Sequence, residues 1–423
     1  MRDILPAIMK WWDAGETFGL ATVVRTFSSA PREPGAALAV SAGGEVVGSV
    51  SGGCVEGAVY ELAGEVSPSG PPVLQTYGIS DNDAFAVGLT CGGIIDIFVE
   101  PVSRELFPEL GEIAAAVKAG EPVAVATVIA GPGQVGARRV IWAVEDDAEA
   151  SAAASDAAAA NGAAANAAAA NGAAAGAAAG DAAGDAATDD GAVRRPSDGT
   201  RSASGTLGSG DRLDQAVDDD ARGMLAQGLT GVRRYGPEGE RRREELSVFV
   251  QSFAPPPRML VFGAIDFAAA VARAGKFLGY RVTVCDARPV FATSARFPEA
   301  DEVVTDWPHR YLASVSTDAR TVICVLTHDP KFDVPLLEVA LRTPAAYIGA
   351  MGSRRTHDDR LARLREVGMT EGELARLRSP IGLDLGARTP EETAVAIAAE
   401  LIQLRWGGSG QPLTVTTGRI HHR

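Results

Sequence analysis

The stretch "RMLVFGAIDFAAAVARAGKFLGYRVTVCDAR", residues 258–288, decides how the second half of the chain folds. A short apolar run, an alanine-rich segment with helical spacing and a second apolar run follow one another in it. A strand, a helix and another strand in this order are typical of a parallel, doubly wound sheet. Such sheets bind ligands beyond the carboxyl ends of their strands, and Gly263 marks the first of these ends. We therefore predict a Rossmann-like domain.

The alternation of strands and helices continues toward the end of the chain. The predicted segments are strands at 301–305, 320–329 and 345–352 and helices at 333–342 and 357–368. A last helix has a clear beginning, because Thr389 is a good N-cap, Pro390 suits the first helical position and Glu392 completes a capping box. Glu392 is therefore expected to be structural.

The first part of the chain predicts a small mixed α/β domain. The run "ALAVSAGGEVVGSV", residues 37–50, predicts a hairpin that turns at Gly43–Gly44. The run "CVEGAVYELAGEV" has helical spacing, so Cys54 should lie just before a helix begins. Two strand-like runs, "GVRRYG" and "LSVFVQSF", precede the linker "APPPR". The predicted boundaries are 1–144 plus 221–253 for the N-terminal domain, 256–405 for the Rossmann-like domain and 406–423 for a tail.

A low-complexity segment, residues 145–220, interrupts the N-terminal domain. It contains 15 acidic and four basic residues and no aromatic residue, and so carries most of the net charge of −15. Alanine favours helices, but the repeated Asn-Gly and Gly interruptions disfavour them, and the segment offers little to bury. We predict a disordered insertion that the fold tolerates.

Composition excludes several classes of protein. A chain of 423 residues with this acidic balance lacks the basic excess of nucleic-acid-binding proteins. No run approaches the ~20 apolar residues that a membrane-spanning helix needs, and no export signal is recognised, so we expect a cytoplasmic protein. Four widely separated cysteines suggest neither a disulfide framework nor a zinc motif.

Two of these cysteines lie beside paired glycines. Cys54 follows Gly52 and Gly53, and Cys91 precedes Gly92 and Gly93. A cysteine at a helix N-terminus favours the reactive thiolate, but a free cysteine is also among the most commonly buried residues. Both interpretations stay open for Cys54, whereas the apolar strand runs around the two remaining cysteines, Cys285 and Cys324, predict buried structural residues.

The turn "GAIDFA", residues 263–268, is an imperfect dinucleotide-binding motif. Gly263 stands in the first glycine position, but Ile265 occupies the second, where a side chain would crowd a pyrophosphate, and Asp266 adds a like charge. Asp286 ends the next strand about twenty residues later, where an acidic residue can bind a ribose hydroxyl. The motif thus predicts the fold better than it predicts NAD(P).

The stretch "YIGAMGSRRTHDDR", residues 347–360, predicts an anion site. Gly349 and Gly352 open the turn after a strand, Ser353 begins a helix, and Arg354 and Arg355 follow. Two cations at a helix N-terminus oppose the helix dipole, which suggests a bound anion. The alternative is that the arginines extend into solvent or pair with the two aspartates that follow.

Five stretches together resemble the XdhC/CoxI family of accessory proteins for xanthine dehydrogenase and related molybdenum hydroxylases. They are "GSVSGGCVEG", "GLTCGGIIDIFVEP", "YIGAMGSRRTH", "PIGLDLGARTPEETAVAIAAEL" and "PLTVTTGRIHH". The match covers both predicted domains in order and omits only the insertion. It departs at residues 263–266, where family members commonly carry a GAGH-type turn and this chain has "GAID".

The resemblance implies a chaperone that binds molybdenum cofactor, assists its sulfuration with a cysteine desulfurase and delivers it to an apo molybdenum hydroxylase. It also implies a homodimer. A metal-dithiolene pterin with a phosphate favours soft thiolates, bare backbone amides and a helix N-terminus. On this basis Cys54 and Cys91 would contact the metal, and the glycines beside them, with residues of the Rossmann-like turns, would bind the rest of the cofactor. Two alternatives remain, namely an NAD(P)-dependent oxidoreductase and a cofactor-free interaction scaffold.

Overall fold

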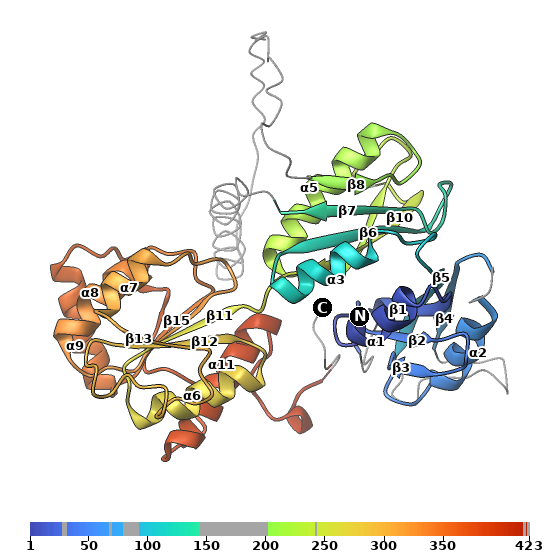
Figure 1. The fold of residues 1–423 in the computed structure, drawn as a ribbon. Coiled ribbons are helices and arrows are strands. Elements are labelled where there is room, and N and C mark those ends of the chain that lie inside the picture. The colour runs from blue at the N-terminus through green and yellow to red at the C-terminus, as the bar shows by residue number, and fades with distance from the viewer. Residues whose placement is uncertain are drawn as a thin grey trace, which may run out of the picture. The chain divides into compact units, whose positions relative to one another are not determined.

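The computed structural model describes residues 1–27, 32–66, 70–78, 93–143, 202–241, 243–417 and 420. The chain divides into two compact units, one made of Met1–Ala143 with Ala203–Arg423 and the other of Val144–Ser202. Only the last residue of the second unit is described, so the predicted disorder of the insertion stays a prediction. The first unit contains three sheets (Figure 1).

The first sheet is antiparallel, with strand order β3-β2-β1-β5-β4. Its strands are β1 (Phe18–Phe27), β2 (Ala37–Val40), β3 (Val46–Gly48), β4 (Val73–Tyr77) and β5 (Ile94–Val102). The predicted hairpin is confirmed, because β2 and β3 pair on either side of Gly43–Gly44. Helix α1 (Leu5–Asp13) precedes the sheet, and α2 (Glu56–Val66) packs on it. Gly19 permits this packing, because a Cβ there would lie 2.1 Å from the Ala63 carbonyl oxygen of α2.

The second sheet is also antiparallel, with strand order β8-β7-β6-β10-β9. Its strands are β6 (Val123–Ala130), β7 (Arg138–Trp142), β8 (Ala203–Gly205), β9 (Gly231–Tyr235) and β10 (Leu246–Phe253). Helices α3 (Leu110–Ala119) and α5 (Asp211–Gln227) accompany it. Residues before and after the insertion therefore build one sheet, as the strand-like runs suggested.

The structured chain resumes earlier than the predicted end of the insertion at Asp220. Strand β8 and the first part of α5 lie before that residue and belong to the second sheet and its helix layer. Leu213 and Val217 of α5 are fully buried at 0% exposure. Asp218 of the same helix is also buried and forms an ion pair with Arg139 of β7. The acidic composition of this helix made it resemble the insertion. Some of its acidic residues are in fact buried partners of an arginine.

The third sheet is parallel and six-stranded, with strand order β13-β12-β11-β14-β15-β16. Its strands are β11 (Arg258–Phe262), β12 (Arg281–Asp286), β13 (Glu302–Thr305), β14 (Val322–Val325), β15 (Tyr347–Ala350) and β16 (Leu377–Arg378). The order reverses beside β11, between β12 and β14, which makes this the topological switch point where doubly wound folds bind ligands. The predicted fold class is confirmed.

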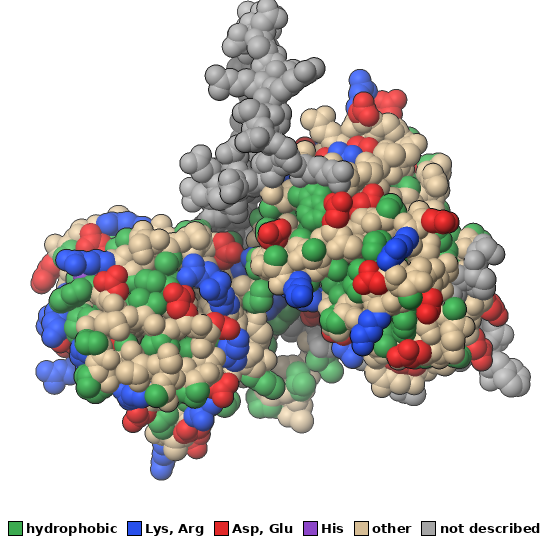
Figure 2. Space-filling view, in the orientation of Figure 1, with side chains coloured by type: hydrophobic (Ala, Val, Ile, Leu, Met, Phe, Trp, Pro, Cys, Tyr) green, Lys and Arg blue, Asp and Glu red, His purple; other side chains and the backbone are tan. Residues whose placement is uncertain are grey.

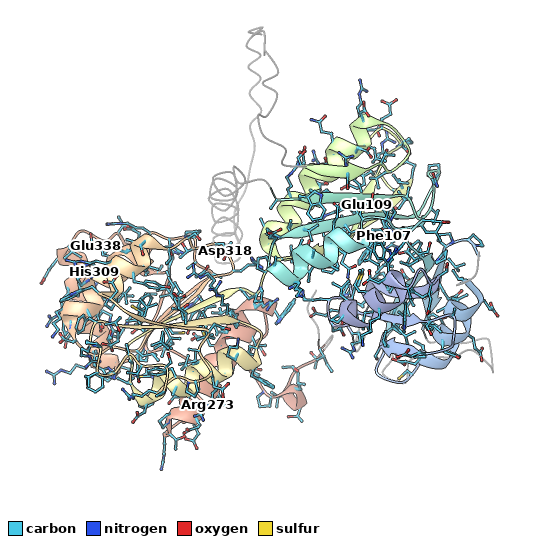
Figure 3. All side chains as sticks on the ribbon, viewed as in Figure 1. Phe107, Glu109, Arg273, His309, Asp318 and Glu338 are labelled. Atoms are coloured by element: carbon cyan, nitrogen blue, oxygen red, sulfur yellow. The ribbon has the colours of Figure 1, made fainter. Side chains whose placement is uncertain are left out.

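Helices cover both faces of the parallel sheet. One face packs against α6 (Asp266–Phe277) and α11 (Pro390–Trp406), and the other packs against α7 (Pro308–Ser314), α8 (Pro330–Ala340) and α9 (Arg354–Glu366). Figure 3 labels Arg273 on α6 and, across the sheet, His309 on α7 and Glu338 on α8. The short helices α10 (Glu371–Leu374) and η1 (Leu413–Val415) complete the chain. The predicted capping box at Thr389 and Glu392 is confirmed.

None of the helices in the described ranges is both long enough and apolar enough to cross a membrane.

Candidate functional site

Several chain segments leave the first sheet at the same end. Strand β3 ends at Gly48, β1 at Phe27 and β4 at Tyr77, and β5 begins at Ile94. The antiparallel register brings Phe27, Ile94 and Tyr77 to one edge of the sheet, and β3 runs toward that edge but ends level with Ala21 of β1. The loop that carries Cys54 follows directly from β3, so this edge is the first candidate site.

Cys91 and Gly92 lie outside the described residues, and Gly93, just before β5, is buried. Strands β2 and β1 lie between β3 and β5, and Gly48 at the end of β3 is level with Val99, five residues along β5 from Ile94. Three strand spacings of about 4.8 Å separate these two strands. The predicted meeting of the two thiols stays a prediction.

The Cys54 loop needs its two glycines for backbone conformation. Gly52 and Gly53 have φ angles of +78° and +123°, which side-chain-bearing residues rarely adopt. A Cβ added to either glycine would meet nothing within 4 Å, so both face open space. Cys54 is half-buried beside them and packs with Val55 on the core under α2. The loop therefore places a thiol next to an uncovered stretch of backbone.

The carboxylate of Glu56, the first residue of α2, organises this loop. Its Oε1 accepts hydrogen bonds from the Ser49 hydroxyl at 2.8 Å and the Ser51 amide at 2.9 Å. Its Oε2 accepts hydrogen bonds from the Ser51 hydroxyl and, at 2.7 Å, from the Gly53 amide. Burial alone would raise the pKa of Glu56, but the Ser51 hydroxyl and the other donors lower it to about 2. Glu56 is therefore an anion that the loop encloses.

The expectation of bare amides in this loop is wrong. The Gly52 amide donates to the Ser49 hydroxyl at 3.1 Å, and the Cys54 amide donates to the Ser51 hydroxyl at 3.0 Å. With the Gly53 amide bound to Glu56, each of these three donors already has an acceptor. A phosphate at the Gly53 amide would have to displace the chain's own carboxylate, so the groups of this loop shown to face open space are the α-carbons of its two glycines.

The other two described cysteines are structural, as predicted. Cys285 and Cys324 are 1% and 0% exposed, and both lie in strands of the parallel sheet. Burial raises the pKa of each thiol to about 12. Neither thiol is available as a thiolate near neutral pH.

The turn after β11 is the second candidate site, and the chain itself fills it. Gly263 has φ +107°, and a Cβ there would lie 2.9 Å from the Thr327 side chain and 3.0 Å from its amide nitrogen. Asp286 is 2% exposed and accepts a hydrogen bond from the Ala264 amide at 2.7 Å. The amide of Arg288 and its guanidinium donate to the same carboxylate at 2.8–2.9 Å.

These contacts control the charge of Asp286. Burial acts to raise the pKa of this carboxyl group, but the Arg288 guanidinium and the Ala264 amide hold the pKa below its usual value. Both carboxylate oxygens are occupied. The predicted role of Asp286 as a ribose ligand would therefore require Arg288 to move away.

A second arginine covers the same turn. Arg296 donates to the Ala264 carbonyl oxygen at 3.1 Å and forms an ion pair with Asp266 at 3.2 Å. Both guanidinium groups lie near the Phe291 ring, with the Arg288 and Arg296 Cζ atoms 4.6 and 5.5 Å from its centroid. Arg296 thus bonds to the turn that would receive a pyrophosphate, and Arg288 bonds to the carboxylate that holds it.

The N-terminus of α9 is the third candidate site. Ser353 is the N-cap, and its hydroxyl accepts a hydrogen bond from the Thr356 amide at 3.1 Å. Arg354 and Arg355 are exposed, and neither forms an ion pair with any residue in the described ranges. The alternative that they pair with the following aspartates is wrong. Solvent exposure and an external anion both remain open.

The two glycines before α9 have packing roles. A Cβ on Gly349 would lie 2.6 Å from the Ile381 side chain, and Gly352 has φ +153° with the Thr356 Cβ 3.0 Å from its own Cβ position. Neither position by itself indicates a ligand. On the visible face of the Rossmann-like domain, cationic and anionic side chains are interspersed (Figure 2), so charge in that view does not mark a site.

Sequence reasoning missed a buried ion pair beside these turns. Asp333 of α8 and Arg360 of α9 are 4% and 3% exposed and lie 3.0 Å apart. Asp333 also accepts a hydrogen bond from Thr327, and Arg360 donates to the Met351 carbonyl oxygen at 2.8 Å. The pair ties the loop after β14 to the loop that leads into α9. One available signal was an aspartate three residues into a helix whose other face is apolar.

Comparison with known proteins gives this site a context. The family described as "XdhC Rossmann domain" matches residues 259–401, and the "XdhC and CoxI family" matches residues 11–78. The second match contains the whole Cys54 loop, and the first contains all of the strands of the parallel sheet except the first residue of β11. The chain belongs to the XdhC/CoxI family.

Two curated relatives cover parts of the chain. It is 31% identical over 159 residues to a probable xanthine dehydrogenase subunit of Bacillus subtilis, which is 38% of this chain and 46% of that protein. It is 28% identical over 181 residues to "Molybdenum cofactor insertion chaperone PaoD" of Escherichia coli, which is 41% of this chain and 50% of that protein. The chain thus spans half or less of the length of these two relatives.

A solved structure shares the fold of this XdhC/CoxI chain over almost its full length. It is described as a xanthine dehydrogenase from Bacillus halodurans, and it covers 98% of this chain and 97% of its own. The TM-score is 0.61 at 21% sequence identity. This likeness concerns the fold alone.

Among the described residues, no three or more His, Cys, Asp or Glu side chains are grouped so as to hold a metal ion.

Proposed function

We propose that this protein is an accessory protein that binds molybdenum cofactor and assists its sulfuration and its insertion into a xanthine dehydrogenase-type molybdenum hydroxylase. The observation that carries the proposal is the Cys54 loop, where a half-buried thiol stands beside two glycines that face open space. Family membership and the relatives named for xanthine dehydrogenase and for cofactor insertion support it.

The chemistry of the loop suits this cargo. Molybdenum bound by a dithiolene is a soft centre and favours a thiolate over an oxygen ligand. Gly52 and Gly53 would let a flat, bulky pterin approach Cys54 without meeting a side chain. Cys91, with Gly92 and Gly93, is proposed as a second thiol that would hold the metal or relay sulfur.

The phosphate of the cargo needs another location, because Glu56 occupies the amides of the Cys54 loop. The proposed phosphate-binding groups are the N-terminus of α9 with Ser353, Arg354 and Arg355, and the adjacent Gly349–Gly352 turn. Two exposed cations without a described ion-pair partner favour this location over the arginine-covered turn at Gly263.

The partners follow from the proposed function. They are an apo molybdenum hydroxylase that receives the cofactor and a cysteine desulfurase that supplies sulfur. We also propose a cytoplasmic location and a homodimer, which is what the family resemblance implies.

The test is metal and pterin analysis of the full chain purified anaerobically from a host that makes molybdenum cofactor. We expect molybdenum and pterin near one per chain in wild type, and their loss in Cys54→Ala. Cys285→Ala is the matched control, because it removes a buried thiol outside the loop and should keep the cargo. Wild type without molybdenum or pterin would contradict direct carriage and favour the interaction scaffold, whose partner binding should survive loss of Cys54 and Cys91.

The oxidoreductase alternative has less support. Asp286, the residue expected to bind a nicotinamide nucleotide's ribose, is already bound by Arg288 and the Ala264 amide. Ile265 stands where a glycine would allow close approach of a pyrophosphate.

A further inference from the structure

We propose that Glu56 is the positioning residue for the Cys54 thiol. Its carboxylate binds the loop from the inside and so fixes where the thiol stands relative to the open glycines. The inference rests on the proposed function for the identity of the cargo, whereas the geometric claim concerns the loop alone.

The number and placement of the donors call for a carboxylate. Each Glu56 oxygen accepts two hydrogen bonds, from Ser49 and Ser51 at Oε1 and from Ser51 and Gly53 at Oε2. An ionised carboxylate has about four acceptor sites and no donor, which matches this set. A glutamine would turn its NH₂ group toward two donors in either orientation of the amide. Its loss of fit is therefore independent of which way the amide flips.

Ser51 transmits the effect of Glu56 to the cysteine. The Ser51 hydroxyl donates to Oε2 of Glu56. The oxygen of the Ser51 hydroxyl in turn accepts hydrogen bonds from the amides of Cys54 at 3.0 Å and Val55 at 3.1 Å. Because the carboxylate fixes the direction of the hydroxyl proton, it also aims the oxygen's lone pairs at these two amides. The chain of contacts runs from Glu56 through Ser51 to the backbone of Cys54.

A general helix-stabilising role does not account for this arrangement. An acidic residue in the first turn of any helix interacts favourably with the helix dipole. Glu56 goes further, because its donors come from Ser49, Ser51 and Gly53, all of which precede the helix. The two roles differ in what they predict. A helix role changes stability alone, whereas a positioning role changes the accessibility of one thiol.

The test is the rate at which iodoacetamide alkylates Cys54 in the folded full chain, followed by peptide mass spectrometry. We expect Glu56→Gln to raise this rate by about tenfold, as loss of charge-assisted hydrogen bonds releases the loop. Glu61→Gln is the matched control, because Glu61 is an exposed acid on the same helix, outside the set of residues that bond to the loop. It should leave the rate unchanged.

A second control separates positioning from stability. Ala63→Gly weakens α2 at a buried position outside the loop. If Ala63→Gly accelerates Cys54 alkylation as much as Glu56→Gln does, Glu56 acts through the helix and the inference is overturned. An unchanged rate in Glu56→Gln also overturns it. Should Glu56→Gln fail to fold, Ser51→Ala removes the intermediate hydroxyl and is expected to raise the rate in the same direction.

Molybdenum content of the same variants connects the inference to the proposed function. We expect Glu56→Gln to lose molybdenum although Cys54 is present, and Glu61→Gln to retain it. Wild type without molybdenum would contradict the proposed function, while the alkylation rates would still decide whether Glu56 positions the thiol. Retention of molybdenum by Glu56→Gln together with an unchanged alkylation rate would overturn the inference and leave the carrier function intact.

Discussion

In two glycine turns of this molecule, a carboxylate of the chain binds a backbone amide. The turns differ in how much space surrounds their glycines. In the Cys54 loop, the Glu56 carboxylate binds the Gly53 amide, and in the turn after β11 the Asp286 carboxylate binds the Ala264 amide. Both turns thereby hold an internal anion at a position typical of a ligand's phosphate. Each carboxyl group has a lowered pKa as a result.

The difference lies in the space around the glycines. Gly52 faces open space, whereas Gly263 packs against Thr327 and Leu326, and Arg296 donates a hydrogen bond to the carbonyl oxygen of the next residue, Ala264. The glycines of the first turn therefore still face open space beside Cys54, while Gly263 of the second turn packs against the chain itself; we call the first the open turn and the second the closed turn. A glycine motif in a sequence indicates only that the backbone needs conformational freedom at that position. Whether a ligand, or the protein itself, uses that freedom depends on residues distant in the sequence.

The largest expected effect concerns the buried Asp333–Arg360 ion pair, which binds Thr327 beside the turn after β11. Arg360→Met removes the partner of Asp333, which is 4% exposed and also binds Thr327. An uncompensated buried charge costs about 3–5 kcal/mol, so urea unfolding should show a loss of this size. The Cys54 loop does not contact this pair, and its alkylation rate should not change. A loss below about 1 kcal/mol would indicate that the closed turn does not depend on this pair.

A matched pair of glycine substitutions tests the comparison directly. Gly263→Ala combines an unfavourable φ with a Cβ 2.9–3.1 Å from Thr327 and Leu326 atoms, whereas Gly52→Ala has the unfavourable φ alone. We expect losses of unfolding free energy of about 3 kcal/mol and about 1 kcal/mol, respectively. Equal losses in urea unfolding would remove the distinction between a closed and an open turn.

The sequence predicted the features that depend on local pattern. The parallel sheet, the hairpin at Gly43–Gly44 and the capping box at Thr389 follow from apolar periodicity and turn chemistry. The position of Cys54 just before α2 follows from the same patterns. These features need no knowledge of which distant residues meet.

The features that depend on tertiary pairing could not be predicted. Nothing local indicates that Arg288 occupies Asp286, because an arginine two residues after an acid is as easily exposed. The acidic start of α5 resembled the low-complexity segment. The structural role of Asp218 becomes apparent only in the fold, where it forms an ion pair with Arg139. Glu56 was assigned no role for the same reason.

Acid titration tests how much the Glu56 carboxylate, through its hydrogen bonds to the Cys54 loop, contributes to the free energy of unfolding. The pKa of Glu56 is about 2 in the folded protein against 4.5 for an unperturbed glutamate, so its stabilisation is present above pH 4.5 and is lost as the pH falls toward 2. Because the group is partly exposed, screening reduces this to on the order of 1 kcal/mol. The stability difference between wild type and Glu56→Gln should therefore shrink over this pH range in urea unfolding. A difference that is constant with pH would mean that the carboxylate's charge does not hold the loop.

The smallest expected effect tests whether the closed turn can be opened. Wild type should show no saturable binding in an NADH fluorescence titration below about 1 mM, because Arg288 and Ala264 occupy Asp286. Arg288→Ala frees part of that carboxylate, yet Ile265 still stands where the pyrophosphate would approach, so any gain should stay below about tenfold.

Arg273→Ala is the control for this titration, because Arg273 lies on α6 and pairs with Glu391, away from the turn (Figure 3). Micromolar NADH binding by wild type would break the comparison, since Arg288 would then be a lid that yields to ligand. Weak binding that appears only in Arg288→Ala would sharpen it. Arg288 alone would then block an otherwise competent ribose site. Of the two turns compared, only the Cys54 loop would admit a cargo without displacement of part of the protein.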